Sequence, residues 1–274
     1  MTENDAAACV RLIGLPTDSH SSFLRGAASA PQAIRLALRS DHSNMTAENG
    51  AELGVEIGFD DAGDLLLDES PADVERIRLS ALEAARSGYV PLFLGGDHMV
   101  SYPIVSGLAA VHGPVNILHF DAHPDLYDDF QDDPLSHASP FARIMEQNLA
   151  SRLVQVGIRT LNRHCHDQAV RFGVEIVRMS DFAAERVPMP EEPLYISIDM
   201  DALDPAYAPG VSHHEPGGLS TREIISVIHR VQTGIVGADI VEYNPARDVN
   251  GITAIVAAKL IKELAALAVK GGRG

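Results

Sequence analysis

Basic residues are scarce in this chain of 274 residues. It contains 21 lysines and arginines against 38 aspartates and glutamates, which gives a formal net charge of −17. Binding to nucleic acid or to an anionic membrane requires clusters of basic side chains, so we expect neither kind of partner. The excess of acidic residues is compatible with a cationic substrate, and it is equally compatible with a role in solubility alone.

Cysteines and long apolar runs are also few. The two cysteines, Cys9 and Cys165, do not form a disulfide framework and fit a reducing compartment. No uninterrupted apolar run approaches the length that spans a membrane. Residues 1–5 are acidic and show no basic segment followed by an apolar one, as a secretory signal would. We therefore expect a cytoplasmic protein without a membrane segment.

The spacing of apolar residues indicates the fold class. Short apolar runs lie at 10–15, 90–94, 115–120, 153–158, 174–177, 194–198 and 235–241. From the second run onward they alternate with stretches of helical spacing, such as 101–111 and 252–269. This alternation predicts βαβ units and a mostly parallel sheet covered by helices on both faces. We expect residues 1–274 to form a single three-layer α/β domain. Residues 41–70 lack the periodicity, and there we expect loops with a short strand near Val55.

The stretch Ser197-Ile-Asp-Met-Asp-Ala-Leu-Asp-Pro205 follows one of these buried strands. Because side chains alternate faces along a strand, Asp199 and Asp201 should point the same way. Two neighbouring carboxylates repel each other and lose solvation, and a divalent cation between them is the simplest remedy. The alternative is a pair of unrelated surface aspartates. It fits poorly with the apolar residues on the N-terminal side, because buried charges are rare unless they are paired or metal-bound.

Three other strand ends carry polar residues of a similar kind. They are Leu94-Gly-Gly-Asp-His98, Phe120-Asp-Ala-His-Pro-Asp125 and Val241-Glu-Tyr-Asn-Pro245. Ligands of open α/β sheets bind outside the carboxyl ends of the strands, so we expect a metal site there. The predicted metal ligands are two histidines and four aspartates: His98, Asp121, His123, Asp125, Asp199 and Asp201. We expect His119, which lies deeper in its strand, to be a core or supporting residue.

The predicted ligand set indicates which metal it would hold. Two histidines with four carboxylates are too anionic for one structural zinc, which prefers cysteine and histidine. An oxygen-rich set with some imidazole suits Mn²⁺ in a two-metal site, with iron, cobalt or nickel as substitutes. A water between two such ions becomes a hydroxide near neutral pH. We therefore expect two Mn²⁺ ions as cofactors of a hydrolase.

These motifs resemble the signature blocks of the ureohydrolases, the arginase and agmatinase family. More narrowly, Ser136-His-Ala-Ser139 and the segments 208–220 and 237–245 resemble plant-type arginases. The resemblance implies an arginase-like fold and a homo-oligomer, a trimer or a hexamer. It also implies how the ligands are shared. One manganese would be held by His98, Asp121, Asp125 and Asp199, and the other by Asp121, His123, Asp199 and Asp201, with Asp121 and Asp199 bridging.

The resemblance assigns further roles near the metals. His137 falls where the family keeps a proton-shuttle histidine, although by its position alone it reads as a residue that caps a helix. Glu242 falls where the family binds the substrate guanidinium, and a carboxylate can hold two N–H groups of a planar guanidinium at once. Asn162 stands where arginases contact the substrate α-amino group. His213 lies in a loop near the substrate, where a plain surface role is the alternative.

The implied reaction is hydrolysis of a guanidino substrate to urea and an amine. We expect L-arginine to give L-ornithine and urea. The alternatives are agmatine, which gives putrescine and urea, and another guanidino acid. A two-metal phosphoesterase would use similar ligands, but Glu242 and the acidic loop that contains Asp128 and Asp133 would repel a phosphate. A non-catalytic relative that binds only metal or a partner is a third alternative.

Overall fold

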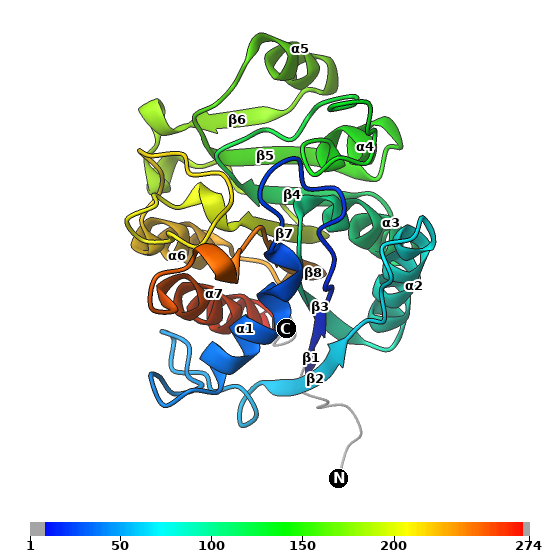
Figure 1. Ribbon diagram of the computed structural model, residues 1–274. Coiled ribbons are helices and arrows are strands. Elements are labelled where there is room, and N and C mark those ends of the chain that lie inside the picture. Colours follow the sequence, from blue (N-terminus) through cyan, green and yellow to red (C-terminus); the bar gives the residue numbers. More distant parts are fainter. Residues whose placement is uncertain (1–8, 271–274) are drawn as a thin grey trace.

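An eight-stranded parallel sheet forms the centre of the computed structural model, which describes residues 9–270 (Figure 1). The strand order is β2-β1-β3-β8-β7-β4-β5-β6, and every neighbouring pair is parallel. The strands are β1 (Cys9–Gly14), β2 (Gly58–Asp64), β3 (Tyr89–Leu94), β4 (Val115–Phe120), β5 (Ala150–Ile158), β6 (Glu175–Arg178), β7 (Leu194–Asp199) and β8 (Gly237–Val241). The acidic segment 1–5 lies outside the described residues.

Helices cover both faces of the sheet. They are α1 (Ala30–Leu38), α2 (Ala72–Arg86), α3 (Ser101–His112), α4 (Pro140–Glu146), α5 (Arg163–Phe172), α6 (Thr221–Arg230) and α7 (Ile252–Ala268). Helices α1, α6 and α7 lie on one side, and α2, α3 and α4 on the other (Figure 1). One apolar core contains Ile34 and Leu260 from the first group, and the second contains Ile77 and Ile104 from the other. The predicted three-layer α/β fold is confirmed.

Local sequence signals explain several helix boundaries. Pro31 lies in the first turn of α1, where a missing N–H costs nothing. Ser220 and Glu223 form a reciprocal capping box at the start of α6. Gly173 ends α5 in the left-handed conformation, with φ of 67°. Among residues 9–270, no helix combines the length and apolarity needed to cross a membrane.

One strand differs from its prediction. The sequence predicts a short strand near Val55, whereas β2 lies at Gly58–Asp64 and contains three aspartates. It pairs only with β1, at the edge of the sheet. Its acidic side chains form ion pairs with arginines, Asp60 with Arg11 and Asp61 with Arg35. A charged edge strand lacks the apolar pattern by which buried strands are recognised, which explains the difference.

The sheet order brings the four strand-end motifs together. Strands β3, β8, β7 and β4 are consecutive neighbours in the sheet, although they are far apart in the sequence. Because all strands run the same way, their carboxyl ends share one edge. His98, Glu242, Asp199 and Asp121 therefore emerge side by side at that edge, where ligands of parallel sheets bind.

A close contact between the turn after β3 and the N-terminal loop supports this edge. A Cβ atom at Gly96 would lie 1.6 Å from the carbonyl oxygen of Thr17. The amide of Asp97 donates to the same oxygen at 3.1 Å, and Gly96 accepts from the amide of Glu242 at 2.8 Å. Only glycine allows the three segments to approach this closely.

We expect Gly96→Ala to lower the free energy of unfolding by about 3 kcal/mol, because the contact is with backbone and no rotamer change relieves it. Chemical denaturation monitored by circular dichroism measures the change. Leu66→Ala is the control, since Leu66 is 90% exposed and its loss should change stability by less than about 0.5 kcal/mol. Equal stabilities of Gly96→Ala and the unsubstituted protein would contradict this account of the turn.

Candidate metal centre and substrate cavity

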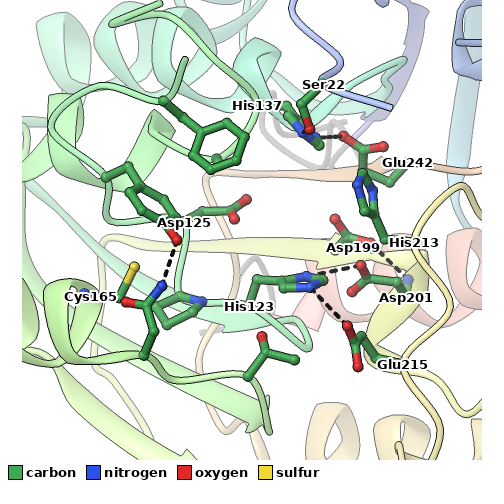
Figure 2. Close-up of a pocket in the computed structure, with 16 residues that line it drawn as sticks. Ser22, His123, Asp125, His137, Cys165, Asp199, Asp201, His213, Glu215 and Glu242 are labelled. Carbon is green, nitrogen blue, oxygen red and sulfur yellow. Dashed lines mark hydrogen bonds and ion pairs between the residues drawn. The ribbon is translucent and has the colours of Figure 1, made fainter. Parts of the chain in front are cut away.

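A cavity of about 300 Å³ opens at the carboxyl edge of the sheet and is lined by 16 residues (Figure 2). Ser22, His137 and Glu242 lie together in one part of it, and His123, Asp201 and Glu215 in another (Figure 2). The predicted ligands His98 and Asp121 lie deeper and are fully buried. The structure thus brings all the predicted site residues to a single region.

The ring nitrogen Nδ1 of His98 faces three carboxylates. It lies 3.2 Å from Asp121 Oδ2, 3.0 Å from Asp125 Oδ2 and 3.2 Å from Asp199 Oδ2. Nevertheless, Nδ1 has no hydrogen-bond partner among the described residues. Ligand atoms that surround an ion at about 2.1 Å and at right angles are about 3 Å apart. Each of the three oxygens therefore lies at the distance from Nδ1 that is expected of two neighbouring ligands of one cation.

A second group of possible ligands shares Asp121. His123 Nδ1 lies 3.1 Å from Asp201 Oδ2 and 3.4 Å from Asp121 Oδ1. Asp121 thus directs one oxygen towards His98 and the other towards His123, as expected of a carboxylate between two ions. Asp199 directs Oδ2 to His98, while its Oδ1 accepts a hydrogen bond from the amide of Asp201 at 2.7 Å. The residues present therefore fit a pair of cations.

The electrostatics of the aspartates also favour a cation. Burial, followed by repulsion from Asp201 and Asp121, raises the pKa of Asp199 well above its ordinary value. Burial and the charge of Asp121 likewise raise the pKa of Asp125. Carboxylates this close to one another are costly to ionise unless a positive charge lies between them. A divalent cation supplies that charge.

Local backbone geometry directs two of the acidic side chains into the cavity. Asp125 and Glu242 both adopt left-handed conformations, with φ of 49° and 62°. Non-glycine residues rarely do so, and such residues cluster at functional sites. Asp201 lies in a 3₁₀ turn, Met200–Ala202, rather than in β7. This turn places the side chain of Asp201 on the same side as that of Asp199. The alternation of side chains along a strand, which the sequence analysis used, is not the cause.

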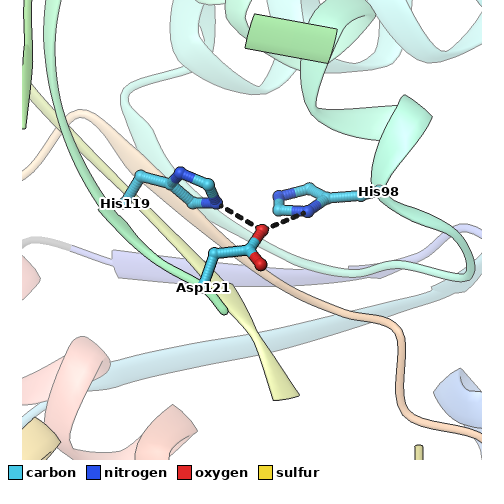
Figure 3. A group of neighbouring side chains, drawn as sticks. All are labelled: His98, His119 and Asp121. Atoms are coloured by element: carbon cyan, nitrogen blue, oxygen red, sulfur yellow. Dashed lines mark hydrogen bonds and ion pairs between the residues drawn. The ribbon is translucent and has the colours of Figure 1, made fainter. Parts of the chain in front are cut away.

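His119 and His98 both face Asp121, from opposite sides (Figure 3). Nε2 of His119 lies 2.8 Å from Asp121 Oδ2, and its Nδ1 lies 3.1 Å from Gln155 Nε2. This atom of the Gln155 amide also lies 2.6 Å from the carbonyl oxygen of Pro124. Because a carbonyl oxygen only accepts hydrogen bonds, the atom is the amide nitrogen, which donates. Nδ1 of His119 therefore accepts, and Nε2 carries the proton that is donated to Asp121. His119 holds Asp121 in place and has no lone pair free for a metal.

A row of three side chains lies beside the metal centre. Ser22 Oγ is 2.8 Å from His137 Nε2, and His137 Nδ1 is 2.9 Å from Glu242 Oε1. Burial lowers the pKa of His137, but the charge and hydrogen bond of Glu242 outweigh it and raise the pKa to about 9. Ser22 was missed by the sequence analysis, because its loop is rich in serine and glycine and carries no motif.

The remaining predicted residues line the cavity. Asn162 Oδ1 accepts from the amide of Cys165 and caps α5, while its Nδ2 donates to the hydroxyl of Tyr127 at 2.5 Å. The ring of His213 lies 5.3 Å from that of His137, and burial together with His137 lowers the pKa of His213. His213 therefore lines the cavity and is not a plain surface residue.

Glu215 is a second residue that the sequence did not reveal. Its Oε1 lies 3.8 Å from Nε2 of His123, on the far side of that ring from Asp201. Its carbonyl oxygen accepts two hydrogen bonds from Arg159, at 2.9 and 2.6 Å. Arg159 also donates to the carbonyl of Asp201 at 2.6 Å. One half-buried guanidinium thus ties the loop of Glu215 to the candidate metal centre.

Two plant arginases are similar to this chain. The protein named arginase 1, mitochondrial, from Arabidopsis thaliana is 47% identical over 95% of this chain and 81% of its own length. The solved structure of arginase from Medicago truncatula matches with a TM-score of 0.89 at 44% identity, over 97% of this chain and 89% of that one. An agmatinase from Gallus gallus, also named mitochondrial, is 37% identical over 92% of this chain and 78% of its own length.

The names of these relatives contradict the cytoplasmic location predicted from the sequence. The plant arginases are named mitochondrial or chloroplastic/mitochondrial. A low cysteine count argues only against oxidising compartments such as the secretory pathway. An organellar transit peptide also differs from the secretory signal that was sought. The features behind the prediction therefore do not separate the cytoplasm from an organelle.

A family model described as the arginase family matches residues 8–266. The match spans all four strand-end motifs, from His98 to Glu242. It confirms the resemblance on which the sequence analysis relied. The fold, the cavity and the relatives agree, and the chain belongs to the arginase family.

Proposed function

We propose that this protein hydrolyses L-arginine to L-ornithine and urea, with two Mn²⁺ ions as cofactors. The observation that carries the proposal is the convergence of His98 Nδ1 with three buried carboxylates next to the pair formed by His137 and Glu242. The similarity to plant arginases over most of the chain supports L-arginine as the substrate. A guanidinium cation suits a cavity with this acidic lining.

The metal ligands in this proposal are those predicted from the sequence. His98, Asp121, Asp125 and Asp199 would hold one ion. Asp121, His123, Asp199 and Asp201 would hold the other, which makes Asp121 and Asp199 the shared ligands. Two bound divalent ions supply water activated as a nucleophile near neutral pH. The oxygen-rich ligand set supports Mn²⁺ over zinc.

Glu242 would hold the guanidinium group. Its Oε1 accepts hydrogen bonds from the amide of His98 and from His137, each at 2.9 Å. Within residues 9–270, these hydrogen bonds to the carboxylate both end on Oε1, which leaves Oε2 for a substrate N–H. A charge-assisted bond to a cation orients as well as attracts. Orientation of the substrate carbon next to the nucleophile lowers the entropic cost of the reaction.

His137 would donate the proton that the leaving amine requires. When the C–N bond of the substrate breaks, the departing nitrogen must gain a proton to leave as an amine. The carboxylate of Glu242 keeps His137 protonated at neutral pH, since it raises the pKa of the imidazole to about 9. Ser22, 2.8 Å from Nε2, orients the ring. His137 would therefore act as a general acid.

Agmatine is the second candidate substrate, and one observation favours it. None of the 16 residues that line the cavity is a lysine or an arginine. The α-carboxylate of L-arginine would therefore be bound by neutral donors such as Asn162 and Tyr127, whereas agmatine lacks this group. The same absence, together with Glu215 and Glu242, disfavours the phosphate group of a phosphoesterase substrate.

We also propose that residues 1–274 form one domain and that the protein is a homo-oligomer, a trimer or a hexamer. The single sheet shared by the described elements supports one domain. The family resemblance of the motifs supports the oligomer. Light scattering coupled to size-exclusion chromatography measures the subunit number, and a monomer at micromolar concentration would contradict the second part.

We expect Asp121→Asn to lower both the affinity for Mn²⁺ and the rate of urea formation at least about 100-fold, because the amide lacks the charge that the two ions would share. Elemental analysis of the dialysed protein measures bound metal, and a colorimetric urea assay measures activity. Asp128→Asn is a matched control, since Asp128 lies outside the ligand set and 58% of its side chain is exposed. Full activity and two bound ions in Asp121→Asn would contradict the proposed centre.

The ratio of kcat/KM for L-arginine to that for agmatine tests the choice of substrate. We expect a preference for L-arginine in the Mn²⁺-loaded protein, as the similarity to plant arginases indicates. A preference for agmatine would mean that the neutral donors in the cavity do not hold the carboxylate. Urea from neither compound, with metal bound, would exclude both substrates and leave another guanidino acid.

His137→Asn should lower kcat by about 10²- to 10⁴-fold with little change in KM, as the loss of a general acid does. The protonated form of His137 is the active one, and it is lost as the pH rises through about 9 in the metal-free protein. Bound cations lower this value by repulsion. A pH profile of kcat should therefore fall on the alkaline side in the unsubstituted protein, and this fall should be missing in His137→Asn. An unchanged profile would exclude the proposed role.

A further inference from the structure

A buried carboxylate lies behind the metal centre, among the strands of the sheet. Asp239 belongs to β8 and is 1% exposed. Its Oδ2 accepts hydrogen bonds from Ser101 Oγ, at 2.5 Å, and from the hydroxyl of Tyr195. Its Oδ1 accepts from Ser197 Oγ at 2.6 Å. Asp239 takes no part in the mechanism described above, yet its carboxylate accepts hydrogen bonds from three hydroxyl groups.

Each of these hydroxyl groups donates its proton to the carboxylate. In each of the three contacts the hydroxyl is the donor and a carboxylate oxygen of Asp239 is the acceptor. Burial and the charge of Asp239 raise the pKa of Tyr195 well above its ordinary value, which keeps that phenol protonated. A hydroxyl has one proton. Ser197 has therefore used its only proton in the bond to Asp239.

This assignment determines the state of His98. Ser197 Oγ also lies 3.0 Å from Nε2 of His98. Since Ser197 has no second proton to give, its oxygen accepts and Nε2 of His98 carries the donated proton. In a neutral imidazole the other nitrogen, Nδ1, then presents its lone pair. Nδ1 is the atom that faces Asp121, Asp125 and Asp199.

Other contacts of His98 do not make this choice. The ring of Phe141 packs edge-on against the imidazole, with centroids 5.3 Å apart and an interplanar angle of 90°. Such packing restrains the ring plane but does not distinguish the two nitrogens. Among the described side chains, Ser197 is the one that forms a hydrogen bond with a ring nitrogen of His98. The tautomer therefore depends on Ser197.

We propose that Asp239 is a positioning residue for the metal centre and acts through Ser197. The pair keeps a proton on Nε2 of His98, so that Nδ1 is the nitrogen available to the cation when it binds. This inference rests on the proposed two-metal function. A histidine ligand whose far N–H is bound to a carboxylate or to its relay is also a stronger base, and loss of such a partner lowers metal affinity by about 10- to 100-fold.

A purely structural role for Asp239 is the alternative, and its three partners separate the two roles. Ser101→Ala and Ser197→Ala each remove one hydroxyl from the same carboxylate. Both residues are fully buried, so the two variants should lose similar amounts of stability. Only Ser197 also contacts His98. The metal affinity should therefore respond to Ser197→Ala and not to Ser101→Ala.

The test measures Mn²⁺ binding to the full metal-free chain by isothermal titration calorimetry, with thermal unfolding of each variant as a check on folding. We expect Ser197→Ala to weaken Mn²⁺ binding by about 10- to 100-fold. Asp239→Asn should have an effect in the same direction, because an amide nitrogen at this position can donate to Ser197 and reverse the relay. Ser101→Ala should bind Mn²⁺ within about threefold of the unsubstituted protein. Urea formation by Ser197→Ala should recover as the Mn²⁺ concentration is raised.

Two outcomes would overturn the inference. Equal Mn²⁺ affinity in Ser197→Ala and the unsubstituted protein would show that the relay does not prepare His98. Equal weakening in Ser197→Ala and Ser101→Ala would show that the cluster acts through stability alone. Failure of the proposed function is distinguishable from both, because it would appear as an absence of Mn²⁺ binding by the unsubstituted protein.

Discussion

Repulsion among buried aspartates is the constraint on which the rest of the site depends. Asp121, Asp125, Asp199 and Asp201 are all at most 7% exposed, and burial and mutual repulsion raise the pKa of Asp199 well above its ordinary value. The fold relieves part of this cost with backbone amides, such as that of Asp201 on Asp199. Divalent cations relieve the remainder. The proposed centre for two cations would need these charges close together, which accounts for their burial at one edge of the sheet.

The candidate metal centre has one side that faces the cavity and another that faces the sheet, and the residues on the two sides differ in their roles. On the cavity side lie His137 and Glu242, which in the proposed mechanism would move a proton and hold a cationic group. On the side of the sheet, two hydrogen-bond chains end on metal ligands, from Gln155 through His119 and from Asp239 through Ser197. Each chain fixes which nitrogen of a histidine carries the proton. In the proposed mechanism, chemistry on the cavity side would therefore rely on proton positions set on the side of the sheet.

The charge of the cavity explains the class of substrate better than its shape does. Carboxylates line the wall, and no lysine or arginine is among the lining residues. A cation is drawn in and a phosphate is repelled. Under the proposed function, discrimination between guanidino compounds would depend on neutral groups such as Asn162 and Tyr127, whose hydrogen bonds are already partly used within the protein. The carboxylates of the wall would thus select a cationic substrate, and the neutral groups would select among guanidino compounds by the part of the substrate beyond the guanidinium.

The sequence by itself determined the features that local patterns encode. Alternating apolar runs gave the parallel sheet, and polar residues directly after strands, such as His98 and Asp121, gave the candidate ligands. The tertiary structure alone decided which distant residues meet. Ser22 lies in no motif, and Asp239 lies within a strand where the sequence assigned it no role. Ser22 reaches His137, and Asp239 reaches Ser197 beside His98, only because the N-terminal loop and the strand order bring them there. Contacts between segments so far apart depend on packing, and residue spacing along the chain does not record it.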